Sequence, residues 1–413
     1  MKSCCVIGLG YIGLPTAILI AKNNCKVIGV DINQEVLNKI NSNNYQTNEP
    51  GLQESLREVK ENNLFETNSK PVEADVFIIC VPTPFKKNKN EFGIPEPNIN
   101  YVLNAAKDIA DKVKPNNLIL LESTSPVGTT NKVLDIIAKN SGIESNLLNV
   151  AYCPERVIPG NIFKELEFNN RVIGGINKKA SIEGKNFYKL FCKGEIFETD
   201  SNTAELVKLS ENAFRDVNIA FANELSMICD ELEIETSKVI EVANKHPRVN
   251  ILNPGCGVGG HCIAVDPWFI AHSSPENSKL IQKARQINNK KSEWVFKKIK
   301  MYSHDYEIKH SKRPTIALMG LSYKPDVDDL RESSAMKIAD KCNNEGLNFI
   351  VCEPFIKNSN KFRLVSIKDV FNTADILVFL VGHTLFKNLD ISDKIFLDFC
   401  GIFKNYSKIN KFM

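Results

Sequence analysis

Short, nearly continuous apolar runs alternate with helical patterns in the first part of the chain. The runs are 4–8, 26–31, 74–81, 117–121 and 148–152. They lack the polar alternation of half-exposed strands, and helical segments such as 102–113 separate them. This pattern predicts a parallel sheet with helices on both faces.

The middle of the chain has the periodicity of long helices instead. From Thr203 to about Glu233, apolar side chains recur at threes and fours, which predicts one long packing helix. A second helical pattern, 279–301, leads to the polar stretch 304–313, which we interpret as a domain boundary. After it, four strand-like runs alternate with helices and predict a second doubly wound half: 314–320, 347–352, 374–381 and 394–399.

Together these patterns predict an α/β fold. We expect two Rossmann-like, doubly wound parallel-sheet domains joined by a central helical segment. The predicted domains are residues 1–200, 201–303 and 312–413.

Composition narrows the class of protein. The 413 residues are 43% hydrophobic and 24% charged, as in an ordinary globular protein, and the net charge of +3 is too small for a dedicated nucleic-acid binder. No apolar stretch approaches the ~18 residues that span a bilayer, and the start does not resemble a signal peptide. We therefore expect a cytoplasmic protein without a membrane partner. The twelve cysteines form no C-x-x-C pair, which favours reduced thiols over disulfides or a metal site.

A glycine-rich turn follows the first predicted strand. Gly8, Gly10 and Gly13 form G-x-G-x-x-G between that strand and a helix, the position where dinucleotide-binding folds hold pyrophosphate. Asp31 ends the second predicted strand, where a carboxylate binds a ribose 2′-hydroxyl and repels a 2′-phosphate. We predict NAD rather than NADP as the cofactor. The alternative is a glycine turn in a Rossmann-like fold that binds no nucleotide.

A second glycine-rich segment, 254–266, has the sequence P-G-C-G-V-G-G-H-C-I-A-V-D. Its four glycines allow the backbone to lie against a ligand. Cys262 follows them near a predicted helix start, which would stabilise a thiolate. It is therefore a candidate nucleophile, with Asp266 one helical turn away. The alternative is a cysteine that only packs inside the loop.

Polar residues also mark the long helix and the ends of two strands. Lys208, Asn212 and Arg215 are spaced i, i+4, i+7, so they form one polar stripe on a helix otherwise patterned for burial, where polar groups need partners. The alternative is an ordinary helix face that is exposed to solvent. Glu155-Arg156 and Thr124 follow strand-like runs, where open parallel sheets bind ligands. Four of the nine arginines fall in candidate segments, which favours bidentate recognition of phosphate or carboxylate: Arg156, Arg215, Arg248 and Arg331.

Several motifs occur in the order found in one family. They are G-x-G-Y-I-G-L-P at 8–15, V-P-T-P at 81–84, E-S-T-x-P-V-G-T at 122–129, C-P-E-R at 153–156, the Lys208/Asn212 helix, G-x-G-V-G-G-H-C at 255–262 and K-P-x-x-D-D-L-R-E-S at 324–333. In these motifs the chain resembles the UDP-glucose/GDP-mannose dehydrogenase family. The resemblance implies, in order, an NAD-binding domain, a central dimerisation and active-site domain, and a UDP-sugar-binding domain.

The resemblance implies two successive NAD-dependent oxidations at C6 of a nucleotide sugar, for polysaccharide biosynthesis, through a thiohemiacetal and a thioester on a cysteine. The motifs at 246–250 and 259–269 favour UDP-N-acetyl-D-mannosamine as the substrate. UDP-N-acetylglucosamine, UDP-N-acetylgalactosamine and UDP-glucose stay open. Two further alternatives are a two-electron hydroxy-acid dehydrogenase, which needs no nucleophilic cysteine, and a non-enzymatic NAD-sensing protein.

By motif position, the resemblance also implies residue roles. The implied catalytic residues are the nucleophile Cys262, the acid/base or oxyanion-stabilising Lys208, Asn212 beside it, Asp266 and Thr124 in a water network, and Glu155 in hydrolysis. The implied cofactor contacts are Gly8, Gly10, Tyr11, Ile12, Gly13, Asp31, Thr83, Thr124 and Arg331. The implied substrate contacts are Arg156, Val157, Lys208, Asn212, Arg215, His246, Arg248, Gly259, Tyr323 and Lys324.

The resemblance further implies a homodimer joined through the long helix, in which Arg248 reaches into the neighbouring subunit's site. Two positions depart from the family. Cys256 stands where close relatives usually have proline, and Cys400 stands where many have a basic residue. The second departure would remove a positive charge from the nucleotide site.

Overall fold

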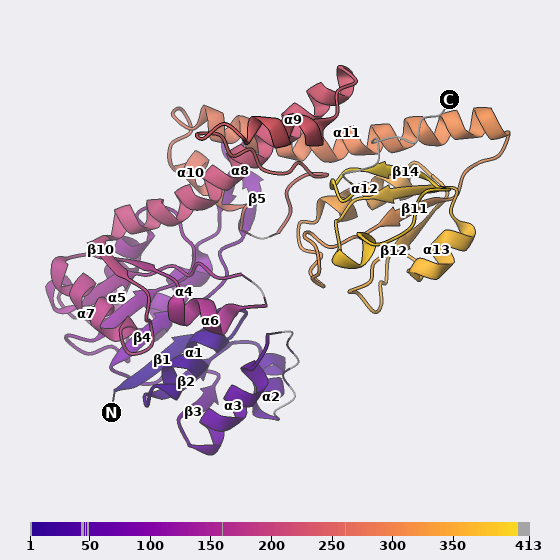
Figure 1. Cartoon of the computed structure of the whole chain (residues 1–413). Helices are drawn as coiled ribbons and strands as arrows, with labels where there is room; N and C mark the ends of the chain where they lie inside the picture. The colour runs from indigo at the N-terminus through magenta and orange to yellow at the C-terminus, as the bar shows by residue number, and fades with distance from the viewer. Residues whose placement is uncertain are drawn as a thin grey trace. The chain divides into compact units, whose positions relative to one another are not determined.

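The computed structural model describes residues 2–42, 45, 47, 49–158, 160–260 and 262–403. His261 of the glycine-rich segment and the last ten residues of the third predicted domain lie outside these ranges. The chain divides into two compact units, 1–210 with 272–275 and 211–271 with 276–413. Figure 1 labels the elements of both units along the chain.

The first unit contains an eight-stranded sheet with the strand order β10-β9-β8-β7-β4-β1-β2-β3. The strands are β1 (Ser3–Ile7), β2 (Lys26–Val30), β3 (Phe65–Asn68), β4 (Val76–Ile79), β7 (Leu118–Leu121), β8 (Asn149–Tyr152), β9 (Arg171–Gly175) and β10 (Ile196–Asp200). All neighbours pair in parallel except β8 and β9, which are antiparallel. The predicted parallel-sheet fold is confirmed. The antiparallel β8–β9 pair was not predicted, because an apolar run indicates burial but not strand direction.

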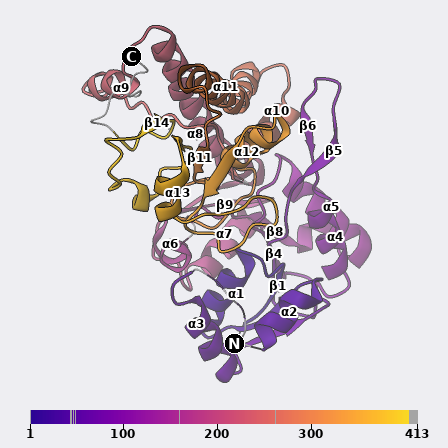
Figure 2. The ribbon, with the colours of Figure 1, turned by 90° about the vertical axis from the view of Figure 1, so that its right-hand side faces the viewer.

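Helices cover both faces of this sheet, as Figure 2 also shows. One face packs against α1 (Gly13–Lys22), α2 (Gln34–Asn41), α3 (Leu52–Glu61), α6 (Ile162–Phe168) and α7 (Lys178–Tyr188). The other packs against α4 (Asn100–Ile109), α5 (Thr129–Ser141) and the first turn of α8. Successive β1 side chains alternate between the two cores, with Cys4 and Val6 in one and Cys5 and Ile7 in the other. A short hairpin, β5 (Phe85–Lys89) and β6 (Pro95–Pro97), follows β4.

Four helices form the middle of the chain: α8 (Ser201–Glu231), α9 (Thr236–Ala243), α10 (Asp266–Ser273) and α11 (Lys279–His310). The predicted boundary at 304–313 is mostly helix, because α11 continues to His310. Tyr306 is buried there and stacks on His310 with ring centroids 4.3 Å apart. Ser303 and Tyr306 thus continue the buried face of α11 into this polar stretch.

The second unit contains a four-stranded parallel sheet with the order β12-β11-β13-β14. Its strands are β11 (Ile316–Met319), β12 (Phe349–Cys352), β13 (Ile376–Phe379) and β14 (Ile395–Asp398). One face packs against α11 and α12 (Ser334–Asn344), and the other against α13 (Ile367–Thr373). The predicted second doubly wound half is confirmed. None of the helices in the described ranges combines the length and apolarity needed to cross a membrane.

Candidate active site

The turn after β1 has the geometry that a dinucleotide requires. Gly8 has φ +94°, and a Cβ on it would lie 2.6 Å from the carbonyl oxygen of Cys80. A Cβ on Gly13 would lie 1.8 Å from the Gly8 carbonyl oxygen, so α1 packs closely on the strand. The Cβ position of Gly10 has no atom within 4 Å, which leaves space for a diphosphate before α1. These three glycines therefore fit NAD.

Asp31 is held in place at the end of β2. Its Oδ2 accepts a hydrogen bond from the backbone N–H of Leu9 at 2.9 Å, and its Oδ1 accepts one from Asn33 at 2.8 Å. Each carboxylate oxygen has a further lone pair for a ribose hydroxyl. Of the other predicted cofactor contacts in this turn, Tyr11 donates from its hydroxyl to Glu49 at 2.9 Å, and Ile12 is the residue before α1.

Thr83 and Thr124 lie together, as their positions after two neighbouring strands suggest. The Thr83 hydroxyl donates to the carbonyl oxygen of Thr124 at 2.7 Å. Glu205 of α8 then accepts from the backbone N–H groups of Gly128 at 2.6 Å and Thr130 at 2.8 Å, where α5 begins. This buried carboxylate fixes the first turns of α8 against the loop that carries Thr124. Lys208, which is also buried, comes one turn later on α8.

Glu155 belongs to a buried charged cluster that the sequence did not predict. Its carboxylate forms an ion pair with Arg171, whose guanidinium lies 4.6 Å from the ring centroid of Tyr188. The Tyr188 hydroxyl donates to Glu122 at 2.6 Å. Burial raises the pKa of Glu122 to about 7, and the negative charge of Glu155 adds to the shift. The Glu155 carboxylate is thus held by the guanidinium of Arg171.

Arg156 and Val157 follow Glu155 and are half-buried. One terminal nitrogen of Arg156 lies 3.4 Å from the carbonyl oxygen of Asn170. Val157 packs against the core on one face of the sheet. Both therefore lie in the loop after β8, at the carboxyl edge of the sheet.

In the second unit, three elements hold the glycine-rich segment. Gly255 donates its N–H to the side-chain oxygen of Asn223 at 2.9 Å, and the Ser292 hydroxyl donates to the carbonyl oxygen of Cys256 at 2.9 Å. Gly260 donates its N–H to the carbonyl oxygen of Arg331 at 3.1 Å. The loop is therefore attached to α8, to α11 and to the segment before α12.

Cys262 lies in the turn that leads into α10. Its carbonyl oxygen accepts from Val265 at 2.9 Å and from Asp266 at 2.8 Å, and α10 begins at Asp266. The Asp266 carboxylate in turn accepts from the side-chain amide of Asn212 at 2.6 Å. Asn212 and Asp266 are both buried, whereas Cys262 is partly exposed. The structure thus brings Asn212 and Asp266 together at the turn of the candidate nucleophile.

The predicted polar stripe on α8 is only partly buried. Lys208 and Asn212 are buried, but Arg215 is exposed. His246 and Arg248 are exposed as well, and the N–H of Arg248 donates to the His246 ring at 3.3 Å.

Three predicted ligand contacts lie in the segment after β11. The Tyr323 side chain lies against Gly259 and Gly260: an added Cβ would lie 2.9 Å from the Tyr323 Cβ at Gly259 and 2.9 Å from the Tyr323 ring at Gly260. The ammonium group of Lys324 is 5.9 Å from the Tyr323 ring centroid. Arg331 forms a bidentate pair with Asp329, with Nε–Oδ1 at 3.0 Å and Nη2–Oδ2 at 2.6 Å. The aromatic ring of Tyr323 and the cationic groups of Lys324 and Arg331 therefore come from one loop.

The turn after β11 repeats the turn after β1 but is filled by the chain itself. Gly320 has φ +95°, close to the value at Gly8. The backbone N–H groups of Leu321 and Ser322 both donate to Oε2 of Glu353, at 2.7 and 3.0 Å. Glu353 is buried, at the end of β12. The Glu353 carboxylate thus binds the N–H of Leu321, as Asp31 binds that of Leu9 after β1, and it binds the N–H of Ser322 in addition.

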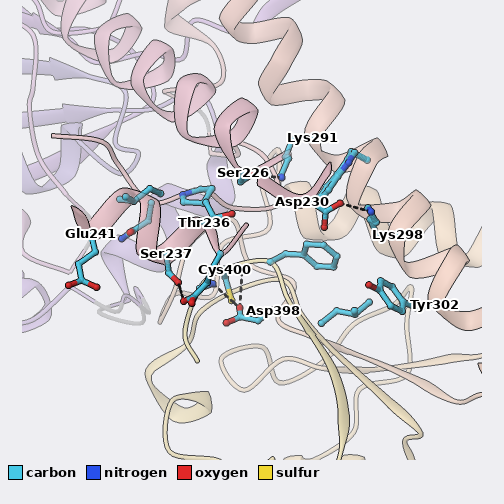
Figure 3. Close-up of a pocket in the computed structure, with 18 of the residues that line it drawn as sticks. Ser226, Asp230, Thr236, Ser237, Glu241, Lys291, Lys298, Tyr302, Asp398 and Cys400 are labelled. Atoms are coloured by element: carbon cyan, nitrogen blue, oxygen red, sulfur yellow. Dashed lines mark hydrogen bonds and ion pairs between the residues drawn. The ribbon is translucent and has the colours of Figure 1, made fainter. Parts of the chain in front are cut away.

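A cavity of about 510 Å³ in the second unit adjoins the end of β14 (Figure 3). Cys400 lies on its wall, and its thiol is 3.4 Å from Asp398. Lys298 in the lining pairs with Asp230 at 2.5 Å. Lys291 donates to Ser226 at 2.7 Å. The cations of this cavity come from α11, whereas the strand end contributes a neutral thiol.

Comparisons with known proteins agree with this organisation. Models of the UDP-glucose/GDP-mannose dehydrogenase family match three parts of the chain: the NAD binding domain at 2–192, the central domain at 202–290 and the UDP binding domain at 317–405. The chain is 46% identical to the UDP-N-acetyl-D-mannosamine dehydrogenase of Campylobacter jejuni, over 96% of this chain and 98% of the relative. It is 43% identical to the NDP-N-acetyl-D-galactosaminuronic acid dehydrogenase of Ralstonia nicotianae, over 97% and 96%.

A solved structure is similar over nearly the whole length. The UDP-D-ManNAc dehydrogenase of Pyrococcus horikoshii superposes with a TM-score of 0.89 at 36% identity, covering 98% of this chain and 96% of that one.

Fold and turn geometry define a dinucleotide-dependent oxidoreductase with two Rossmann-like halves. The chain belongs to the UDP-glucose/GDP-mannose dehydrogenase family, and it is an NAD-dependent nucleotide-sugar dehydrogenase.

Proposed function

We propose that the protein oxidises C6 of UDP-N-acetyl-D-mannosamine to the uronate. One alcohol, two NAD⁺ and one water give one carboxylate, two NADH and three protons. The observation that carries this proposal is the buried Asn212–Asp266 hydrogen bond at the turn of Cys262. A two-electron dehydrogenase needs no such cysteine turn.

Each proposed catalytic side chain acts on a stated atom. Lys208 takes the proton from the C6 hydroxyl as C6 gives up a hydride, and Cys262 Sγ then adds to C6 of the aldehyde while the thiol proton passes to the aldehyde oxygen, which gives a thiohemiacetal. Loss of a second proton and a second hydride converts the thiohemiacetal to the thioester. The Asn212 amide has two N–H donors, of which one binds Asp266, so the second is positioned for the developing oxyanion. NAD⁺, when bound, supplies the hydride acceptor for each oxidation.

Hydrolysis of the thioester uses the remaining residues. Water adds to C6, the C–S bond breaks, and Cys262 leaves as a thiolate. Asp266 and Thr124 order this water, and Glu155 assists its deprotonation while Arg171 holds the carboxylate in place. The remaining cofactor and substrate contacts keep the roles that the resemblance implies for them.

The choice of sugar rests on the relatives. The Campylobacter jejuni protein named for UDP-N-acetyl-D-mannosamine is 46% identical, and the Ralstonia nicotianae protein named for a galactosaminuronic acid product is 43% identical. Because these identities differ little, a panel of UDP-N-acetylhexosamines, UDP-glucose and GDP-mannose should be assayed with NAD⁺. The proposal requires the highest kcat/KM with the mannosamine compound.

We also propose a homodimer in the cytosol. The exposed apolar side chains of α8 support the dimer, since Phe214, Phe221 and Ile228 recur every seven residues and are 70%, 55% and 47% exposed. Arg248 is exposed within its own chain, as a residue that completes a partner's site would be. The cysteines, all within the described ranges, are thiols, which supports a reducing compartment.

The decisive experiment counts NADH and acid together. The wild-type enzyme should form two NADH per uronate, and Cys262→Ala should form less than a few per cent of the acid while binding NAD⁺ as before. One NADH per substrate, or acid formation by Cys262→Ala near the wild-type rate, would overturn the covalent mechanism.

A further inference from the structure

A buried row of polar side chains joins α8 to α11 beside the glycine-rich segment. α8 contributes Asp216 and Asn223, two turns apart, and α11 contributes Arg285 and Asn288. All four residues are at most 2% exposed. A buried polar group without a partner is costly, so the pairing within the row is constrained; Oδ2 of Asp216 and Nε of Arg285 are its two atoms without a hydrogen-bond partner.

The hydrogen bonds of this row run in one direction. Asn288 donates from Nδ2 to Oδ1 of Asp216 at 2.7 Å, and Arg285 donates to the same oxygen at 2.5 Å. Asn223 donates from Nδ2 to Oδ1 of Asn288 at 2.9 Å. The N–H of Gly255 then donates to Oδ1 of Asn223 at 2.9 Å. The Asp216 carboxylate can only accept, and the backbone N–H of Gly255 can only donate. The side-chain amides of Asn288 and Asn223 lie between these two groups, so they can form this series of hydrogen bonds in one orientation only.

We infer that Asn223 is a positioning residue for the loop that carries Cys262, and that Asp216 and Asn288 fix the orientation of its amide. The inference rests on the proposed nucleophilic role of Cys262. Gly255 is the first glycine of this loop, and glycine-rich backbone loses the most conformational freedom when it is ordered. An acceptor held rigidly beneath Gly255 therefore keeps the loop in one conformation.

The relay can be broken without changing its shape. In Asn223→Asp, a carboxylate oxygen replaces the amide nitrogen that faces Oδ1 of Asn288, so two acceptors meet and the acceptor beneath Gly255 loses its fixed orientation. We expect kcat to fall at least about tenfold while KM for NAD⁺ stays within about twofold. Hydrogen exchange of the loop peptide 253–260, measured without substrate, should become at least about tenfold faster.

The urea midpoint separates positioning from folding. A merely structural role of Asn223 would shift the urea midpoint of the variant and leave kcat of the folded enzyme and loop exchange at their wild-type values.

Gln286→Glu is the matched control. Gln286 is exposed on α11, so the same change from amide to carboxylate adds a charge outside the relay. This variant should retain the wild-type kcat and loop exchange. If Asn223→Asp does not fold, Asn223→Ser decides, because serine shortens the acceptor beneath Gly255 without adding charge; it should reproduce the loss of kcat and the faster loop exchange.

Two results would overturn the inference: wild-type kcat and loop exchange in the broken relay, or a loss of kcat with loop exchange unchanged. Failure of the proposed function gives a different result. In that case the wild-type enzyme forms no uronate, or Cys262→Ala still forms it, and neither result depends on the rate of loop exchange.

Discussion

The side-chain amide of Asn212 donates a hydrogen bond to the Asp266 carboxylate at 2.6 Å. This contact ties the middle of α8 to the first residue of α10, and Cys262 lies one turn before that residue. It leaves the amide with one N–H and the carboxylate with lone pairs for the reacting groups. Asp266 contributes both this hydrogen bond and a negative charge, and a mutation can remove the charge while it keeps the hydrogen bond.

Asp266→Asn keeps the shape and can still accept from Asn212, but it removes the charge. We expect kcat to fall about 100-fold, because the water network loses its anionic acceptor, with KM for the sugar changed less than about threefold. Steady-state NADH formation measures both. Glu276→Gln, an exposed carboxylate paired with Lys279, is the control and should be neutral. Activity of Asp266→Asn within about twofold of wild type would show that the charge is not used.

Asp31→Asn tests the choice of cofactor. The amide oxygen can still accept from the N–H of Leu9, so the turn should survive while the repulsion of a 2′-phosphate disappears. We expect the preference for NAD⁺ over NADP⁺ in kcat/KM to narrow by about 10- to 100-fold. If the wild-type enzyme uses both cofactors equally, Asp31 does not face the ribose.

Glu122→Gln tests the buried cluster through pH. Burial raises the pKa of Glu122 to about 7 in the folded chain, above its value of 4.5 in the unfolded chain. Its contribution to stability is therefore complete below about pH 4.5 and is lost as pH rises through about 7. Glutamine stays neutral at both pH values. The free energy of unfolding of the variant, relative to that of wild type, should therefore rise by up to roughly 3 kcal/mol between pH 5 and pH 8.

Urea unfolding at the two pH values measures this gain. Glu61→Gln, an exposed carboxylate at the end of α3, should show no such pH-dependent difference. A gain for Glu122→Gln that is equal at both pH values would mean that Glu122 does not titrate in this range.

The proposed dimer predicts complementation between two inactive variants. In a hybrid of Cys262→Ala and Arg248→Ala chains, one site has an intact cysteine from its own chain and an intact arginine from its partner. Random mixing makes half of the dimers hybrid, so activity should recover to about a quarter of wild type. No recovery after proven subunit exchange would place Arg248 in its own chain's site.

Phe221→Asp should abolish this recovery and yield monomers by sedimentation, because it places a charge on the exposed stripe of α8. Phe92→Asp, at an exposed phenylalanine beside the β5–β6 hairpin, is the control and should leave the dimer intact.

The local parts of the site could be predicted from the sequence, and the long-range parts could not. The Gly8 turn and Asp31 follow from one strand–turn–helix–strand unit, in which spacing alone determines the geometry. The Glu155–Arg171 pair depends on how β8 and β9 are paired, and the apolar pattern carries no strand direction. Helical spacing gives the angle of Arg215 around α8, but not which segment covers that turn, and Arg215 is exposed.

The carboxylate of Glu353 limits how many cofactors one chain can hold. Leu9 and Leu321 each donate their N–H to the carboxylate that follows the next strand, but in the second half Ser322 donates to this carboxylate as well. Gly10, at the position equivalent to Ser322, leaves open space in front of α1. The second half thus keeps the architecture of a dinucleotide fold with its phosphate-binding turn closed by its own side chain. Titration with NAD⁺ should therefore saturate at a stoichiometry of one per polypeptide, although the fold is present twice.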